Sequence, residues 1–192
     1  MWKQCTLLNK TDIVDAFKQI NIRRDQYHLF CLKWRDSYYY STRLCFGSRS
    51  SPYIFDTLSR AICWIVENNY EISIIFHLLD DFLTVQPSNT SGHKTMALLN
   101  MIFNRLNVPI SEKKAIGPTT CLEYLGIILD TGSMEARLPE DKVSRIIDFI
   151  ESFLRNRSVR KRELLQLLGH FNFAARVVLP GRPFVAYLMK YL

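Results

Sequence analysis

Three aspartates have the spacing that a metal site would require. Asp12 follows an apolar segment whose pattern predicts a strand. Asp80 and Asp81 separate two short apolar runs, residues 72–79 and 82–85, which favour a hairpin with the two aspartates at its tip. If the strands are neighbours, three carboxylates meet at one sheet edge. They repel one another unless a cation neutralises them, and hard oxygen ligands suit Mg²⁺. A structural interpretation stays open, because paired aspartates are common in turns and Asp12 could cap a helix.

Composition excludes several other kinds of protein. The chain has 192 residues, of which 48% are hydrophobic and 22% charged, so disorder is not expected. Its longest strictly apolar run, residues 61–66, is far shorter than the roughly 20 residues of a membrane span. The first residues lack the apolar core of a signal peptide, which predicts an intracellular protein in the nucleus or cytoplasm. The five cysteines form no CxxC pair, so neither a disulfide framework nor a cysteine zinc site is expected.

The net charge of +7 is unevenly distributed along the chain. Residues 1–60 carry ten basic and five acidic residues, residues 61–136 four and eight, and residues 137–192 eleven and five. An acidic middle between two basic flanks suggests a carboxylate site served by surfaces that attract polyanions. The four histidines show no metal-ligand spacing and are expected to be structural.

The elements that would position the aspartates alternate between strands and helices as far as residue 135. The patterns predict a strand over 5–14, a short helix over 16–20, hairpins over 27–44 and 122–138, and helices over 52–67 and 94–106. The helix that begins at Pro52 should bury Ile54, Leu58, Ile62 and Ile65. From Pro139 onward only helical periodicity is present. We therefore expect an α+β domain over residues 1–135 and a helical module over residues 136–192.

Five segments of the chain resemble the motifs of reverse transcriptases, in the family's order. They are residues 11–20 (TDIVDAFKQI, motif A), 44–55 (LCFGSRSSPYIF, motif B), 78–83 (LLDDFL, motif C), 111–114 (SEKK, motif D) and 123–129 (EYLGIIL, motif E). The helical tail resembles the thumb of retrotransposon enzymes. Motif B and residues 173–182 look most like tyrosine-recombinase retroelements of the DIRS and Ngaro kind. The resemblance implies an antiparallel polymerase palm backed by helices, followed by a helical thumb.

The same resemblance implies an activity and its participants. The family adds deoxynucleotides from their triphosphates to a primer 3′ end on an RNA or DNA template, using two Mg²⁺ ions that Mn²⁺ can replace. By position in the motifs, the catalytic residues would be Asp12, Asp80, Asp81 and Lys114, with Lys113 as a rival for the lysine. The metal ligands would be Asp12, the Ile13 carbonyl, Asp80 and Asp81. The nucleotide would contact Asp15, Ala16, Phe17 and Gly47, with Phe17 as the steric gate against a 2′-hydroxyl.

Primer and template would contact the second part of the chain. The resemblance implies a primer grip at Tyr124, Leu125 and Gly126. A basic run would face the duplex backbone and give salt-sensitive affinity without sequence preference; its members are Arg155, Arg157, Arg160, Lys161 and Arg162. Nothing in the sequence points to a membrane or indicates an oligomeric state.

Three features depart from the family pattern and motivate alternatives. Leu78 stands where motif C has an aromatic residue, and Phe46 stands where retroviral enzymes have glutamine. Motif A begins at residue 11, so most of the fingers subdomain is expected to be missing from these residues. One alternative is therefore a non-catalytic relic that still binds nucleic acid. Another is a protein-interaction module, whose partner covers the palm surface where fingers would pack.

Overall fold

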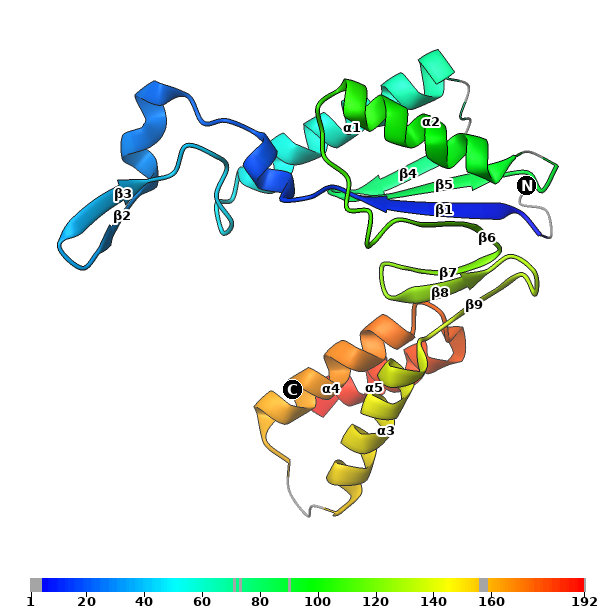
Figure 1. The fold of residues 1–192 in the computed structure, drawn as a ribbon. Helices are drawn as coiled ribbons and strands as arrows, with labels where there is room; N and C mark the ends of the chain where they lie inside the picture. The colour runs from blue at the N-terminus through cyan, green and yellow to red at the C-terminus, as the bar shows by residue number, and fades with distance from the viewer. Residues whose placement is uncertain (1–4, 71, 73, 90, 156–158, 192) are drawn as a thin grey trace. The chain divides into compact units, whose positions relative to one another are not determined.

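The computed structural model describes residues 5–70, 72, 74–89, 91–155 and 159–191, which form two units (Figure 1). The first unit is Met1–Thr120 and the second is Cys121–Leu192. The division precedes three strands, β7 (Cys121–Tyr124), β8 (Ile127–Asp130) and β9 (Glu135–Arg137). The sequence pattern assigns the first two to the first domain and ends that domain within the third. These strands pair only with one another among the described strands, so they form a sheet of their own.

A four-stranded antiparallel sheet forms the centre of the first unit. Its order is β4-β5-β1-β6, with β1 at Leu7–Asp12, β4 at Ile75–Leu78, β5 at Asp81–Gln86 and β6 at Ile116–Thr119. Two helices, α1 (Ser51–Tyr70) and α2 (Gly92–Arg105), lie along one face of this sheet (Figure 1). The fold is thus the α+β arrangement that the alternating patterns predict.

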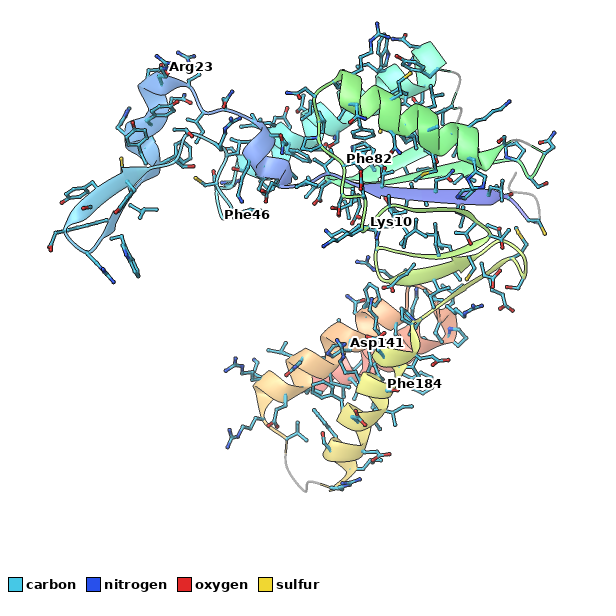
Figure 2. All side chains as sticks on the ribbon, viewed as in Figure 1. Lys10, Arg23, Phe46, Phe82, Asp141 and Phe184 are labelled. Atoms are coloured by element: carbon cyan, nitrogen blue, oxygen red, sulfur yellow. The ribbon has the colours of Figure 1, made fainter. Side chains whose placement is uncertain are left out.

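Side chains alternate between the two faces of the sheet, so register decides which residues meet the helices. Thr11, Phe82 and His77 stand opposite one another on three adjacent strands, on the helix side. There Phe82 packs in a core that combines side chains from the sheet, α1 and α2. Lys10 lies on the opposite side (Figure 2). Asp12 and Asp81 are cross-strand partners on the same side as Lys10.

The hairpin tip lies one residue earlier than the sequence predicts. Leu78 pairs with Asp81, so the two-residue turn consists of Leu79 and Asp80. Asp81 is instead the first residue of β5, where its pairing with Asp12 extends the ladder between β1 and β5. The expectation that both aspartates occupy the tip is therefore wrong, and only Asp80 does so.

Helix α1 begins one residue before Pro52, as expected, and its buried face includes only part of the predicted set. Its buried residues are Ser51, Phe55, Ser59, Ile62, Cys63 and Val66. Ile54 is 39% exposed, while Leu58 and Ile65 are only partly buried. Burial of Ile62 is thus confirmed, and Leu58 and Ile65 pack against the core, so the prediction is wrong only for Ile54. The hydrophobic pattern also missed the buried serines, because it does not count serines as core residues. The hydroxyl of Ser59 is hydrogen-bonded inside the protein to a distant carbonyl, which makes its burial tolerable.

The rest of the first unit consists of short elements. They are the 3₁₀ helices η1 (Ala16–Gln19) and η2 (Arg24–Phe30) and the strands β2 (Cys31–Trp34) and β3 (Ser37–Tyr40). Strands β2 and β3 form an antiparallel hairpin that is exposed along its whole length.

The second unit contains a three-stranded antiparallel sheet and the expected helices. Its strands are β7 (Cys121–Tyr124), β8 (Ile127–Asp130) and β9 (Glu135–Arg137). The helices are α3 (Glu140–Arg155), α4 (Lys161–Ala174) and α5 (Arg182–Leu188), with 3₁₀ turns η3 (Leu179–Gly181) and η4 (Met189–Tyr191). Leu168, Ala175 and Val185 form its small helical core.

Five α-helices, α1 to α5, lie within the described residues. None of them is both long enough and apolar enough to cross a membrane.

Candidate active site

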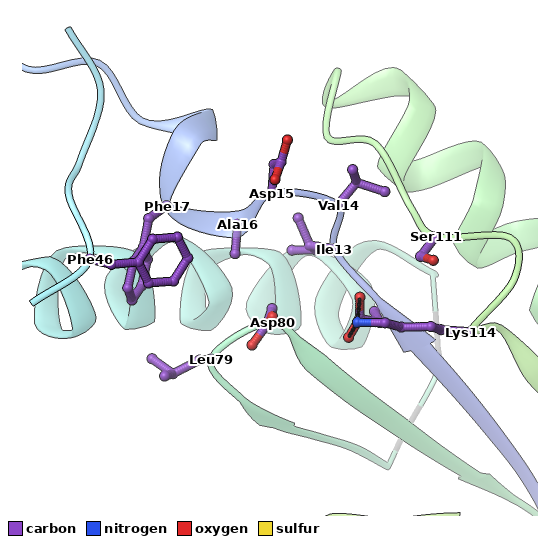
Figure 3. Close-up of a pocket in the computed structure, with 11 residues that line it drawn as sticks. Ile13, Val14, Asp15, Ala16, Phe17, Phe46, Leu79, Asp80, Ser111 and Lys114 are labelled. Carbon is purple, nitrogen blue, oxygen red and sulfur yellow. Dashed lines mark hydrogen bonds and ion pairs between the residues drawn. The ribbon is translucent and has the colours of Figure 1, made fainter. Parts of the chain in front are cut away.

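A pocket of about 410 Å³ lies where β1 ends beside the turn between β4 and β5. It contains seven of the residues to which the motifs assign roles, and Figure 3 shows most of them converging on it. These seven are Asp12, Ile13, Asp15, Ala16, Phe17, Asp80 and Lys114. Four further residues, Val14, Phe46, Leu79 and Ser111, complete the lining. Motifs A, B, C and D, which are separated by many residues in the chain, thus contribute side chains to one cavity.

Backbone hydrogen bonds hold the end of β1 from two sides. The Ile13 N–H donates to the Asp80 carbonyl over 3.1 Å, which joins β1 to the hairpin turn. On the other side, the Ser111 N–H donates to the Asp12 carbonyl over 2.8 Å. Main-chain hydrogen bonds therefore join the end of β1 to Asp80 on one side and to Ser111 on the other. The positions of Asp12, Asp80 and Ser111 are thus coupled without relying on flexible side chains.

Two lining residues have backbone conformations that are unusual for residues other than glycine. Leu79 has φ 55° and Asp15 has φ 50°, both in the left-handed region. Each such residue costs on the order of 1–3 kcal/mol and persists only when its surroundings enforce it. In a two-residue hairpin turn, glycine is favoured at the first position when φ there is positive. Leu79 occupies that position, so its backbone conformation is energetically unfavourable.

Lys114 reaches the pocket and pairs with Asp12. Its Nζ lies 3.0 Å from both carboxylate oxygens of Asp12, while 63% of the lysine side chain stays exposed. The hydrogen bond to Asp12 and the charges of Asp12, Asp80 and Asp81 raise the pKa of Lys114 above its ordinary value. The Lys114 amine that pairs with Asp12 is therefore protonated. Of the two candidate lysines of motif D, Lys114 is the one that lines this pocket.

Asp80 is in an unfavourable environment for a negative charge. Its pKa is raised, first because burial removes the carboxylate from water and then because Asp12 and Asp81 carry like charges nearby. The charge of Lys114 offsets this only partly. A carboxylate whose charge is disfavoured by its neighbours gains from any additional cation.

Asp81 does not line the pocket and has a cation of its own. Lys10 lies on the same face of the sheet, and its Nζ is 3.6 Å from an Asp81 carboxylate oxygen. Across the described ranges, no three His, Cys, Asp or Glu side chains come close enough to hold a metal ion by themselves. The pocket thus brings together Asp12 and Asp80, whereas Asp81 stands beside them on the next strand.

The donor set in the pocket is chemically suited to a hard divalent cation. Asp12 and Asp80 offer carboxylate oxygens, and the backbone of Ile13 between them offers a carbonyl. Lys114 acts here as a stand-in cation, because its ammonium group occupies both oxygens of Asp12. The side-chain and backbone oxygens present therefore fit a hard divalent cation such as Mg²⁺ or Mn²⁺.

Phe17 closes one side of the pocket and also belongs to the core. Its ring lies 4.9 Å from the ring of Phe46 and 5.6 Å from that of Phe55, and it is only 8% exposed. Gly47, which the motifs predict to contact the nucleotide, follows Phe46 in the chain. Its φ of +83° favours glycine, although the space beside it would admit a side chain. Both interpretations of Phe17, core aromatic and pocket wall, are compatible with this position.

The expected primer grip is a tight turn in the second unit. Leu125 (φ 50°) and Gly126 (φ 78°) connect β7 to β8, as in a type I′ hairpin. Lys142 of α3 donates from Nζ to the Gly126 carbonyl over 2.7 Å and lies 4.6 Å from the centre of the Phe173 ring. A side chain at position 126 would displace the flexible end of Lys142, and the φ of +78° itself favours glycine there.

The basic run lies between the last turn of α3 and the first turn of α4. Arg155 pairs with Glu151 over 2.9 Å, which offsets part of its charge. Arg160 precedes α4, and its backbone N–H donates to Glu163, while Lys161 and Arg162 begin the helix. Arg157 lies outside the described residues. These residues share a segment, and the Arg155–Glu151 ion pair offsets part of its positive charge locally.

Comparison with protein families identifies the chain. The family model described as reverse transcriptase (RNA-dependent DNA polymerase) matches residues 2–129. The chain belongs to the reverse transcriptase family. The matched range includes every lining residue of the pocket, so the pocket is part of the reverse transcriptase domain.

Solved reverse transcriptases share the fold. A foamy viral protease-reverse transcriptase in complex with an RNA/DNA hybrid has 19% identity and a TM-score of 0.68, covering 97% of this chain and 24% of that one. Two further foamy viral structures in complex with double-stranded DNA have TM-scores of 0.69 and 0.67, at 18% and 19% identity. They cover 97% and 94% of this chain, and 31% and 37% of the viral chains. This reverse transcriptase chain thus spans about a quarter to a third of the viral chains. A search of curated proteins gives no match.

The sequence analysis missed four residues of the pocket. Phe46 and Ser111 belong to motifs B and D, where they are neighbours of Gly47 and of the lysine pair. Val14 and Leu79 adjoin aspartates of motifs A and C. Each could have been found as a neighbour of a motif residue, but no property of the side chains themselves indicates a pocket.

Proposed function

We propose that this chain is the palm and thumb of an RNA-directed DNA polymerase, which adds deoxynucleotides to a primer 3′ end. The observation that carries the proposal is the shared pocket of Asp12 and Asp80, with Phe17 and Lys114 in its lining. Membership of the reverse transcriptase family supports the reaction class, and the foamy viral complexes with RNA/DNA hybrid and double-stranded DNA support nucleic acid partners.

Asp12, Asp80 and the Ile13 carbonyl would hold the divalent cations, with Asp81 as a peripheral ligand or charge partner. When bound, two Mg²⁺ ions supply activation of the primer hydroxyl and neutralisation of the leaving pyrophosphate. Lys114 is protonated and would leave Asp12 to give its proton to the leaving pyrophosphate. Its exposed side chain leaves it free to move in this way.

Other residues would bind the nucleotide, primer and template. Backbone N–H groups of Asp15 and Ala16 would contact the triphosphate, and Phe17 and Gly47 would contact its sugar and base. In the second unit, Tyr124, Leu125 and Gly126 would contact the primer. The basic run from Arg155 to Arg162 would contact phosphates of the duplex. The likeness of motif B and residues 173–182 supports a retroelement of the DIRS or Ngaro kind, acting inside the cell.

Primer extension tests the proposal. A labelled DNA primer annealed to an RNA template, and separately to a DNA template, is incubated with the chain and deoxynucleotides in Mg²⁺ or in Mn²⁺. We expect metal-dependent extension that chelation abolishes. A chain that binds the duplex but incorporates nothing under either metal would contradict polymerase activity.

A second candidate is a nucleic-acid-binding relic without catalysis. The observation that favours it is the Asp12 carboxylate, both oxygens of which are already engaged by Lys114. This candidate predicts duplex binding that weakens steeply with salt and does not change when Asp12 is replaced by Asn, apart from a small effect of charge. It also predicts no extension in the assay above.

Replacing Phe17 by Val should relax selection of the sugar. The shortened side chain leaves room beside Phe46 where the 2′-hydroxyl of a ribonucleotide would lie, so discrimination against ribonucleotides should fall by about tenfold to a hundredfold. The measurement is the ratio of incorporation rates for the two sugars, which does not depend on the folded fraction. Phe55→Val is the matched control, because it removes a buried ring that contacts Phe17 but does not line the pocket. An unchanged ratio in Phe17→Val would rule out the gate.

A further inference from the structure

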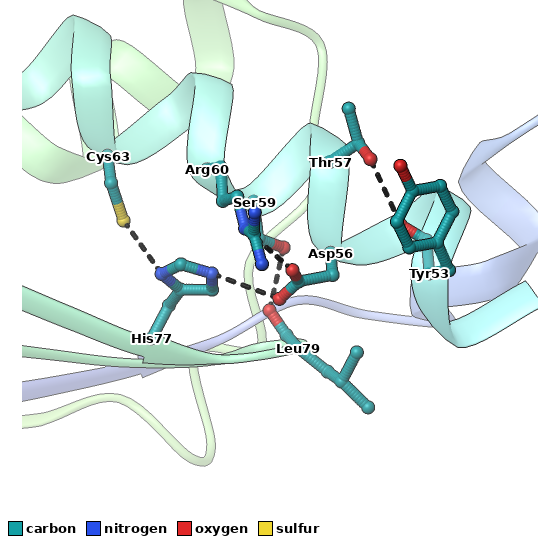
Figure 4. A network of polar contacts seen from close by, with 8 residues as sticks. All are labelled: Tyr53, Asp56, Thr57, Ser59, Arg60, Cys63, His77 and Leu79. Atoms are coloured by element: carbon teal, nitrogen blue, oxygen red, sulfur yellow. Dashed lines mark hydrogen bonds and ion pairs between the residues drawn. The ribbon is translucent and has the colours of Figure 1, made fainter.

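The turn that carries Asp80 is held by hydrogen bonds to both of its carbonyls. The Ser59 hydroxyl of α1 donates to the Leu79 carbonyl over 2.7 Å (Figure 4), and the Ile13 N–H donates to the Asp80 carbonyl over 3.1 Å. Ser59 is fully buried, and its hydroxyl comes from the face of α1 that packs against the sheet. Since Leu79 has a positive φ, its conformation depends on such contacts.

A second set of contacts fixes the same stretch of α1 to β4. His77 lies two residues before Leu79; its Nε2 is 3.2 Å from Asp56 and its Nδ1 is 3.3 Å from the Cys63 sulfur. Asp56 also pairs with Arg60 over 2.8 Å (Figure 4). Asp56 and Cys63, which lie on either side of Ser59 along the helix, therefore both contact His77 of β4. This makes α1 a rigid support from which the hydroxyl of Ser59 is presented to the turn.

The Cys63, His77 and Asp56 side chains have the order of a nucleophilic triad, but their environment excludes that role. Burial, with the charges of Glu67 and Asp56, raises the pKa of Cys63 to about 12. The thiol therefore stays protonated, whereas a nucleophilic cysteine needs an accessible thiolate. The network is a structural link between helix and strand.

We propose that Ser59 is a positioning residue for Asp80. Its hydroxyl holds the Leu79 carbonyl, and so keeps the strained turn in the conformation that directs the Asp80 carboxylate into the pocket beside Asp12. This inference rests on the proposed function, in which Asp12 and Asp80 bind divalent cations. Without the hydroxyl, the turn can relax and the two carboxylates no longer share a cation in a fixed geometry.

Ser59→Ala tests the proposal through Mn²⁺ binding. Free Mn²⁺ is measured by electron paramagnetic resonance during titration of the chain with Mn²⁺ alone, and the affinity is expressed per folded chain from circular dichroism. We expect the variant to bind Mn²⁺ about tenfold more weakly than the wild type, the size of effect that one lost hydrogen bond gives. The Mg²⁺ concentration for half-maximal primer extension should rise by a similar factor.

Two further variants make the test specific. Thr57→Ala is the matched control: its hydroxyl donates to the Tyr53 carbonyl within the same helix and does not touch the turn, so Mn²⁺ affinity should not change. In the double variant Ser59→Ala, Leu79→Gly, the turn no longer needs support because glycine adopts positive φ without strain. Mn²⁺ affinity should return to within about threefold of the wild type.

Each outcome decides between the possibilities. If Asp80→Asn binds Mn²⁺ as tightly as the wild type does, the metal site itself is refuted and the proposed function fails. If Asp80→Asn weakens binding while Ser59→Ala does not, only the positioning role is refuted. If Ser59→Ala does not fold, the double variant decides: a folded chain with wild-type affinity supports the proposal, and weak binding or failure to fold overturns it.

Discussion

Replacing Asp80 by Asn is expected to reduce primer extension by about a thousandfold, equivalent to about 4 kcal/mol of transition-state stabilisation. Asn has nearly the same volume and retains one acceptor oxygen, but it carries no charge to neutralise a divalent cation. The carboxylates that line the pocket are Asp12, Asp15 and Asp80. Because Asp15 is paired with Lys18 over 3.0 Å, the loss leaves Asp12 as the remaining pocket carboxylate of the proposed metal site. The measurement is a single-turnover rate with saturating duplex, in Mg²⁺ and in Mn²⁺.

The same substitution should not destabilise the fold. The pKa of Asp80 is raised in the folded chain by burial and by the charges of Asp12 and Asp81. A carboxyl group whose pKa is higher in the folded chain than in the unfolded chain destabilises the folded state at neutral pH. The reason is that its charged form, which predominates at that pH, is less favourable in the folded chain. Neutralising it therefore removes a penalty, and the free energy of unfolding should stay equal or rise slightly.

Asp36→Asn provides the control for this experiment. Asp36 lies in the exposed turn between β2 and β3, away from the residues that line the pocket. Its replacement should leave extension unchanged. Extension by Asp80→Asn within tenfold of the wild-type rate would show that Asp80 does not bind a catalytic metal ion.

Replacing Phe82 by Ala is expected to lower the free energy of unfolding by about 3–5 kcal/mol, which is the usual cost of a large cavity in a core. Phe82 is fully buried, one residue after Asp81. Its ring packs edge-on to Phe103 of α2 at 5.3 Å between centroids, and stacks on His77 at 5.9 Å. The ring thus joins α2 to the strand pair that carries Asp80. The measurement is denaturant unfolding followed by circular dichroism.

Phe76→Ala is the matched control for the core. Phe76 is on β4 in the same hairpin, but it lies on the opposite face and is 46% exposed. Its replacement should cost less than half as much as that of Phe82. Equal losses for the two variants would mean that the helix side of the sheet is not the main core of the first unit.

Local patterns predicted the elements around the pocket well, because each depends on neighbouring residues. The apolar segment before Asp12 became β1, and the paired apolar runs became β4 and β5. Pro52 marked the start of α1 because its ring suits a helical first turn and it has no N–H to leave unpaired. The motif resemblance to reverse transcriptases is confirmed by the family match over residues 2–129. The assigned roles of individual residues remain predictions.

Register, burial of polar groups and the partner of each charge were decided only in three dimensions. The hairpin turn moved by one residue because Asp81 pairs with Asp12 on another strand, a contact between residues far apart in the chain. Ser59 lies on the inner face of α1 because a carbonyl twenty residues away accepts its hydrogen bond. The ion pair with Asp12 distinguishes Lys114 from Lys113, and Lys10 forms the ion pair with Asp81. Sequence patterns report which side chains prefer to be buried, whereas these features depend on distances between distant segments, which only the folded chain determines.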